Sequence, residues 1–246
     1  MNRLRKTRDT LSGPVGLIPA LDVDSMDALL RVVEVTSQVQ GVAGYKLGLT
    51  GSLRMGLAPA IQAIRDITDL PVIYDHQKAG PDMPDMAAKF AAICAEAGAD
   101  ALILFPVAGP HAVKSFVGET IKSGMIPVVG GHIPVPDYCI SGGGYIVDDV
   151  IHRIVAVAVG VGARHFVLPA NNPEAIRQHI QRTAEAVKAP VVFLTGFGAL
   201  GGDIETAFTA AEGSKSRFAI VGRNVCNSPS PADAARRYID AMMSVA

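Results

Sequence analysis

The chain has 246 residues and a formal net charge of −1, so it carries no basic surplus that would attract a nucleic-acid backbone. The three cysteines, Cys94, Cys139 and Cys226, are scattered and form no C-x-x-C pair, which predicts free thiols in a reducing cytosol rather than a disulfide or zinc framework. No apolar run approaches the roughly 18 to 20 residues needed to span a bilayer, and the basic N-terminus lacks the apolar core of a signal peptide. We therefore expect a cytoplasmic protein without nucleic-acid or membrane partners.

Short β-branched runs alternate with longer amphipathic, Ala-rich stretches along the whole chain. The predicted strands are 16–23, 41–48, 71–76, 99–106, 125–131, 164–170, 190–196 and 217–223. Each run is apolar on both faces, as parallel strands are when helices cover both sides of them. Helix-like segments lie between the strands, for example at 25–38, 86–98 and 173–187.

Eight β-then-α units match the (β/α)₈ barrel in both number and chain length. The alternative is a doubly wound open sheet, but the absence of a G-x-G-x-x-G turn favours a closed barrel. We expect one domain over residues 1–246, with 1–15 as an N-terminal extension. Residues 131–149 form a long Gly/Pro-rich stretch after the fifth strand, either a functional loop or a flexible insertion.

Charged residues stand at the carboxyl ends of the first three predicted strands. The first strand ends in Asp22, the second in Lys46, and the third in Asp75, followed by Lys78 and Asp82. Because barrel chemistry collects at these strand ends, we expect the five side chains to converge at the mouth of the barrel. Each charge would favour the ionised form of its neighbours. Asp75 and Lys46 end strands made for burial, where an unpaired charge would be costly.

Other polar residues near these strand ends have more ordinary interpretations. Asp82 precedes a helix-like run, so helix capping and function are equally good interpretations, and for Asp85 capping is the better one. His76 should face away from the lumen and serve packing or support the residues of the site from behind. His132, in the loop after strand five, is a candidate substrate contact. No His, Asp and Glu spacing predicts a zinc site, and there is no G-x-S-x-G nucleophile elbow.

The last two strands end in glycine-rich segments that suggest a phosphate site. "TGFGALGGD" contains Gly201 and Gly202, and "VGRNV" contains Gly222 and Arg223. Loops after strands seven and eight are the usual phosphate-binding corner of this fold, and arginine can grip phosphate through two parallel hydrogen bonds. The simpler alternative is that the glycines only make tight turns. Agreement between two adjacent loops favours phosphate binding.

The charged residues at the ends of the first three strands and the two glycine-rich segments occur in the order seen in the orotidine 5'-phosphate decarboxylase family. The chain resembles this family from about residue 16 to the C-terminus. The resemblance implies cofactor-free and metal-free conversion of orotidine monophosphate to uridine monophosphate, in a homodimer whose Asp82 completes the neighbouring site. It implies that Asp22 and Lys46 hold the ribose hydroxyls, and that Lys46 joins a tetrad with Asp75, Lys78 and Asp82. The Lys78 ammonium would stabilise the carbanion at C6 of the pyrimidine and then protonate it.

The resemblance also assigns Arg223 and the loop around Gly201 and Gly202 to the binding of the substrate's phosphate.

The sequence departs from the family's pattern in four places. The usual D-x-K-x-x-D is one residue longer in each gap, so the cluster must bulge or shift at the strand end. Met86 stands where a Thr is usual and Leu200 where a Gln is usual, and the loop at 131–138 has no Ser or Thr to meet the pyrimidine.

Two other functions remain as alternatives. A related sugar-phosphate decarboxylase or aldolase would use Mg²⁺ to stabilise an enediolate, but the sequence lacks the extra acidic ligand that we would expect. A non-catalytic barrel that binds a nucleotide or phosphate would fit the missing Gln and Ser/Thr. Such a binding protein has no need for a costly array of charges at strand ends.

Overall fold

The computed structural model describes residues 11, 13–77, 83–188, 190–198 and 200–246 of the chain. Lys78 and Asp82 lie outside these residues, so the roles predicted for them still rest on the sequence. The prediction that Asp85 caps a helix is wrong. Asp85 lies inside the 3₁₀ turn η2 (Pro84–Met86), and the N-cap positions of this turn and of the following helix are Met83 and Met86.

Within the described residues, eight parallel strands form one sheet in the order β1-β8-β7-β6-β5-β4-β3-β2. The strands are β1 (Val15–Pro19), β2 (Tyr45–Gly48), β3 (Val72–Asp75), β4 (Ala101–Leu104), β5 (Ile126–Val129), β6 (His165–Pro169), β7 (Val191–Thr195) and β8 (Ser216–Val221). The sheet closes between β1 and β2, where Ala43 N donates to Leu17 O at 2.9 Å and Leu21 N donates to Lys46 O at 2.8 Å. The predicted (β/α)₈ barrel is confirmed, and all eight strands lie at or within one residue of the predicted ranges.

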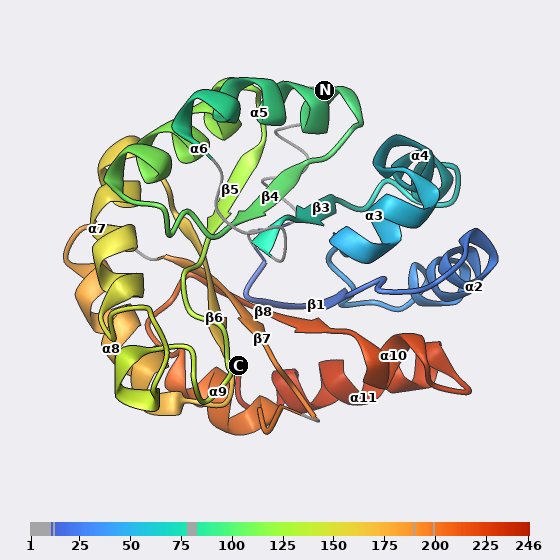
Figure 1. Ribbon diagram of the computed structural model, residues 1–246. Helices are drawn as coiled ribbons and strands as arrows, with labels where there is room; N and C mark the ends of the chain where they lie inside the picture. Colours follow the sequence, from blue (N-terminus) through green and yellow to red (C-terminus); the bar gives the residue numbers. More distant parts are fainter. Residues whose placement is uncertain (1–10, 12, 78–82, 189, 199) are drawn as a thin grey trace.

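Helices surround the strands on the outside of the barrel (Figure 1). They are α2 (Met26–Thr36), α3 (Leu49–Met55), α4 (Leu57–Arg65), α5 (Ala87–Glu96), α6 (Pro110–Lys122), α7 (Val150–Val161), α8 (Pro173–Ala184), α9 (Ile204–Ala210), α10 (Arg223–Cys226) and α11 (Pro231–Met243). Polar side chains cap several of them: Ser25 accepts from Ala28 N at the start of α2, and Asp203 from Thr206 N at the start of α9. Proline at the start of α6, α8 and α11 supplies the dihedral angle that a first helical turn needs.

Side chains on the strands alternate between two buried clusters, one inside the barrel and one between barrel and helices. Ile73 belongs to the inner cluster, whereas Tyr45, Leu47 and Tyr74 belong to the outer one. Successive side chains of a strand point to opposite faces. Lys46 lies between the outward residues Tyr45 and Leu47, and Asp75 lies two positions after Ile73. The side chains of Lys46 and Asp75 must therefore both point into the lumen, at the carboxyl end of the barrel interior.

The segment before β1 takes part in the barrel core. Residues 1–15 were expected to be an extension, but Leu11 is fully buried in the inner cluster and Val15 already begins β1. Leu11 is one of the large side chains with no exposed surface. Leu11 and Val15 of this segment are therefore built into the fold.

His179 is a buried titratable group far from the strand-end charges in the sequence. It lies on α8 with 1% of its surface exposed, and its ring contacts Phe166 edge-on at 5.3 Å between centroids. The ring of His152 lies 6.3 Å away. Neither ring nitrogen of His179 has a hydrogen-bond partner among the described residues. Burial, reinforced by His152, lowers the pKa of His179 to about 3.

All three cysteines are free, as the sequence predicts, and the structure shows that they are also buried. Burial raises the pKa of Cys94 and of Cys226 to about 12, and it also raises that of Cys139. Within the residues that the structure describes, no helix is both long and apolar enough to cross a membrane.

Candidate active site

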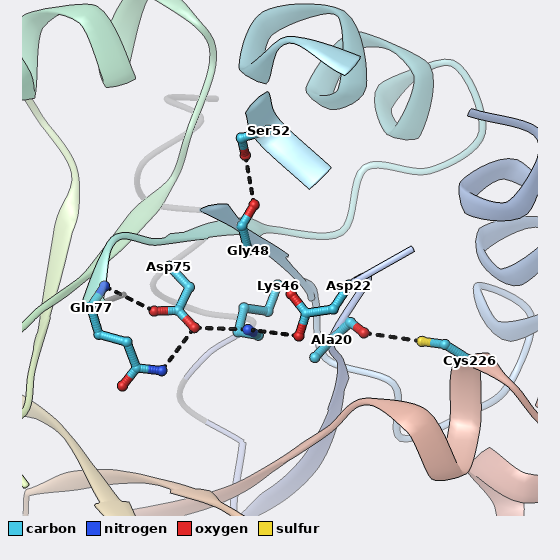
Figure 2. Close-up of polar contacts among 8 residues, drawn as sticks. All are labelled: Ala20, Asp22, Lys46, Gly48, Ser52, Asp75, Gln77 and Cys226. Atoms are coloured by element: carbon cyan, nitrogen blue, oxygen red, sulfur yellow. Dashed lines mark hydrogen bonds and ion pairs between the residues drawn. The ribbon is translucent and has the colours of Figure 1, made fainter. Parts of the chain in front are cut away.

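A buried lysine lies between two carboxylates at the carboxyl ends of β1, β2 and β3 (Figure 2). Lys46 Nζ is 2.7 Å from Asp75 Oδ2 and 3.3 Å from Asp22 Oδ2. Lys46 is 4% exposed and Asp75 is fully buried, whereas the Asp22 side chain keeps 32% of its surface exposed. The three charges thus form a chain that runs from the barrel interior toward solvent. The structure brings these three predicted residues together.

The local sequence explains how this chain of charges is built. Gly48 is paired with Asp75 in the register of β2 and β3, so the ends of the two strands lie side by side. A Cβ atom at Gly48 would come 2.0 Å from Asp22 Oδ1, which means that glycine is needed to leave room for this carboxylate. The hydrogen bond from Leu21 N to Lys46 O holds the segment after β1 against β2.

The two carboxylates keep Lys46 positively charged. Burial by itself would lower the pKa of this ammonium, but Asp75 and then Asp22 outweigh it, and the net effect is a raised pKa. A buried charge of this kind is tolerated only when it is paired and hydrogen-bonded. The arrangement is therefore a fixed, permanently charged group beside the cavity described below.

Gln77 is part of this site, although its residue type and position in the sequence predict no role for it. Its side-chain Nε2 donates to Asp75 Oδ2 at 3.0 Å, and its backbone N–H donates to Asp75 Oδ1 at 3.2 Å (Figure 2). The signal in the sequence was the extra residue between Asp75 and Lys78. His76, by contrast, packs outward against the rings of Tyr74 and Phe90, as predicted.

The charged residues form one side of a cavity of about 330 Å³ at the mouth of the barrel. This volume lies within the range of small-molecule sites. Six residues predicted from the sequence line it or flank it: Asp22, Lys46, Asp75, His132, Gly222 and Arg223. The ends of strands 1, 2, 3 and 8 and the loop after β5 therefore meet around one cavity.

Gly201 and Gly202 do not line this cavity. Gly202 lies in a neighbouring groove that also contains Arg223, and the N–H groups of both glycines are used inside their own loop. Gly201 N donates to Gly198 O at 2.8 Å and Gly202 N to Gly196 O at 3.0 Å. These two glycines thus make a tight turn, as the simpler alternative proposed, and the phosphate role predicted for their backbone is not supported.

The side of the cavity opposite the charges is apolar. Ile133, Pro134 and Val135 come from the loop after β5, and Phe197 and Leu200 from the loop after β7. Residues 132–135, the first part of the long stretch 131–149, are therefore a wall of the site. A substrate here would meet charges on one side and hydrocarbon on the other.

His132 lies in the same loop, held at the boundary of the cavity. Its ring packs against the edge of Tyr138, whose hydroxyl donates to Gly131 O at 2.9 Å. Burial lowers the pKa of His132, although Asp148 opposes the shift. His132 is therefore neutral at neutral pH and offers the cavity a neutral imidazole.

The carboxyl end of β1 is also tied to the last part of the barrel. Cys226 on α10 donates its thiol to Ala20 O at 3.1 Å (Figure 2). A Cβ atom at Gly222 would lie 4.0 Å from Asp22 Oδ2, which places the end of β8 beside this carboxylate. The segment carrying Gly222 and Arg223 therefore lies directly next to the chain of charges.

A closed (β/α)₈ barrel with buried charges around a cavity at the carboxyl ends of its strands defines a barrel of the enzyme type. The model of the orotidine 5'-phosphate decarboxylase / HUMPS family matches residues 16–238. The chain therefore belongs to this family, as its strand-end residues indicated.

Curated relatives agree with this assignment, and a solved structure shares the fold. Orotidine 5'-phosphate decarboxylase of Pyrococcus abyssi is 29% identical over 224 residues, which cover 91% of this chain and 97% of that protein. The enzyme of the same name from Methanococcoides burtonii is 29% identical over 229 residues, covering 92% and 96%. The crystal structure of orotidine 5'-monophosphate decarboxylase from Methanocaldococcus jannaschii with the inhibitor BMP superimposes with a TM-score of 0.79 at 24% identity, covering 94% of this chain and 99% of that one.

Proposed function

We propose that this chain is a lyase that decarboxylates orotidine 5'-monophosphate to uridine 5'-monophosphate in pyrimidine biosynthesis, without a cofactor. The observation that carries the proposal is the buried chain Asp22–Lys46–Asp75, which borders a nucleotide-sized cavity beside Arg223. Such an array of fixed charges suits a reaction whose transition state gains negative charge on carbon. Family membership and the names of the relatives support the same activity.

In the proposed reaction, the bond between C6 and the carboxylate breaks and its electron pair stays on C6 while CO₂ leaves. The Lys78 ammonium stabilises this carbanion and then gives it a proton. Asp75 and Asp82 hold Lys78 in place and keep it charged. Lys46 and Asp22 hold the ribose hydroxyls. The roles of Lys78 and Asp82 rest on the resemblance, since both lie outside the described residues.

The phosphate end of the substrate is assigned to the end of β8. Gly222 and Arg223 line the cavity next to Asp22, so a phosphate held by the Arg223 guanidinium leaves the ribose within reach of the chain of charges. Binding energy from the phosphate, which does not react, can then be used at C6. His132 is assigned to contact the substrate from the loop side.

The assembly that we propose is a cytoplasmic homodimer in which Asp82 of each subunit completes the site of the other. The support for it is the resemblance to the family, in which the last Asp of the cluster after the third strand reaches into the partner's site. In this chain Asp82 holds that place in the order of the cluster.

Incubating the purified protein with orotidine monophosphate is expected to release CO₂ and change the pyrimidine absorbance. Lys78→Ala is expected to abolish turnover, because the ammonium that stabilises and protonates C6 is gone, while uridine monophosphate still binds in calorimetric titration. A folded wild-type protein that never turns the nucleotide over would contradict the proposed function. Turnover that survives in Lys78→Ala would contradict the role of this residue alone.

The apolar wall formed by Ile133, Val135 and Leu200 favours a second candidate, a related enzyme for another phosphorylated substrate, since polar side chains are usual there in the family. Members that act on sugar phosphates would need Mg²⁺. Turnover of orotidine monophosphate that is unchanged by a chelator is therefore the expected result. Activity on a pentulose or hexulose phosphate that a chelator removes would identify the second candidate.

Gly48→Ala is expected to lower turnover by about 100-fold, because its Cβ would push the Asp22 carboxylate out of the position next to Lys46. Gly48 has φ −87°, so the effect would come from the clash and not from backbone strain. The matched control is Gly160→Ala in α7, where a Cβ meets nothing within 4 Å. Equal turnover in the two variants, measured under the same conditions, would refute the importance of Asp22.

A further inference from the structure

Gln77 is bound to both oxygens of the Asp75 carboxylate. Its side-chain Nε2 lies 3.0 Å from Oδ2, the oxygen that also accepts from Lys46 Nζ at 2.7 Å, and its backbone N–H lies 3.2 Å from Oδ1. Asp75 is fully buried, so these protein donors take the place of water around the carboxylate. Among the residues that the structure describes, Gln77 therefore supplies two of the three hydrogen bonds to this carboxylate.

The position of Gln77 follows from the alternation of side chains at the end of β3. Ile73 and Asp75 face the lumen, while Tyr74 and His76 face outward and their rings are in contact. A regular continuation places the residue after His76 on the lumen side, where Gln77 lines the cavity. In the family's usual D-x-K spacing the lysine would hold this position. The extra residue in this chain gives the position to an uncharged amide and moves Lys78 one place onward.

The side-chain amide adds a restraint on the orientation of the carboxylate. The terminal torsion of an aspartate is soft, and the Gln77 backbone N–H and Lys46 hold one oxygen each. The amide is a second donor on Oδ2 and restrains the plane of the carboxylate further. Because Lys46 is bound to the same oxygen and also to Asp22, the orientation of Asp75 sets the position of the ammonium that faces the cavity.

We propose that Gln77 is a positioning residue: its side-chain amide holds the Asp75 carboxylate, and through it the Lys46 ammonium, in the orientation that the reaction uses. The inference deepens the proposed decarboxylation and rests on it for its kinetic test. Gln77 takes no part in bond breaking, since an amide neither donates a proton to C6 nor carries charge. Its effect is transmitted through Asp75.

Gln77→Met is the first test, because methionine keeps the length of the side chain and the backbone N–H but loses the amide donor. We expect kcat for orotidine monophosphate to fall by about 10- to 100-fold and KM to rise by no more than about five-fold, since the charges shift while Lys46 is the one proposed substrate contact that moves with them. Gln178→Met is the matched control. Gln178 Nε2 also donates to a carboxylate at 3.0 Å, that of Glu174, but on the exposed face of α8.

Gln77→Glu gives a pH signature that a purely structural role would not produce. At pH 8 the introduced carboxylate repels Asp75, and we expect kcat at or below that of Gln77→Met. The proximity of Asp75 raises the pKa of the introduced carboxyl. At acidic pH it becomes protonated and can donate its O–H to Asp75 as the amide does. We therefore expect the ratio of kcat in Gln77→Glu to kcat in Gln77→Met to rise at least about five-fold between pH 8 and pH 5.

Crystal structures of wild type, Gln77→Met and Gln178→Met decide the question independently of turnover. In Gln77→Met the Asp75 carboxylate is expected to be rotated and the contact between Lys46 Nζ and Asp75 Oδ2 changed, whereas Gln178→Met is expected to leave both as in wild type. An unmoved Asp75 and Lys46 in Gln77→Met overturn the proposal, as does wild-type kcat in this variant or equal pH profiles in the two Gln77 variants. Absence of wild-type turnover would instead reject the proposed function, and the structures would still settle the role of Gln77.

Discussion

Lys46→Met is expected to abolish turnover and to lower the free energy of unfolding by about 3 to 5 kcal/mol, because removing one partner of a buried ion pair leaves an uncompensated charge. Lys46 is 4% exposed and Asp75 fully buried, so solvent screens the pair little. Urea denaturation followed by far-UV circular dichroism measures the loss; the chain has no Trp, which makes intrinsic fluorescence a weaker probe. An unfolding midpoint equal to that of wild type would contradict the expectation.

Two further variants test whether the loss of stability in Lys46→Met comes from the unpaired charge of Asp75 or from the removal of the lysine side chain itself. In Lys46→Met combined with Asp75→Asn neither buried charge remains, so part of the lost stability is expected to return, with a coupling energy of about 1 to 3 kcal/mol, while turnover stays absent. Lys122→Met is the surface control. Lys122 contacts Glu119 at 2.5 Å but is 73% exposed, and its removal is expected to cost less than about 1 kcal/mol.

The second large effect concerns the dependence of stability on pH. The pKa of His179 is about 3 in the folded protein, against 6.5 for an ordinary histidine. Between pH 6.5 and about pH 3, His179 is protonated in the unfolded chain but stays neutral in the folded protein. The free energy of unfolding is therefore expected to fall with decreasing pH across this window, by about 1.4 kcal/mol per pH unit from this group alone. Above pH 6.5 the contribution is constant.

His179→Leu isolates this contribution. Relative to wild type, the variant is expected to gain about 2 kcal/mol in stability between pH 7 and pH 5, since it has no proton to take up when it unfolds. Burial and Arg182 lower the pKa of the neighbouring His152, and Asp149 raises it. His152 is present in both proteins, so its own contribution to the pH dependence cancels in the comparison. His111→Leu at an exposed position is the control. Parallel stability curves for wild type and His179→Leu would show that this histidine is protonated in the folded state.

The barrel could be predicted from sequence because its signal is repeated. Eight apolar runs at regular spacing specify eight buried strands, and the side-chain period of two then fixes which residues face the lumen. That is why the sequence alone predicts that Lys46 and Asp75 lie together. The same period explains the outward packing of His76.

The loops were harder to predict because their hydrogen bonds depend on the chain's tertiary path. The glycines at 201 and 202 resemble a phosphate loop in composition, yet their N–H groups bond to carbonyls of the same turn. Asp85 has the chemistry of a helix cap, but it lies inside the 3₁₀ turn that precedes α5, and the N-cap position of α5 is Met86. The role of Gln77 depends on whether the extra residue after β3 points its side chain into the lumen, and the composition of the segment does not show this.

The cysteines described earlier have a practical consequence for labelling experiments. All three thiols are buried and have raised pKa values, so the nucleophilic thiolate is scarce at neutral pH and alkylating reagents should react with them slowly. Tyr145, in the stretch that continues from the apolar wall, is 97% exposed. A cysteine introduced there by Tyr145→Cys could carry a maleimide dye without removal of the native cysteines. Fluorescence from that single position would then report directly on how residues 131–149 respond when a nucleotide enters the cavity.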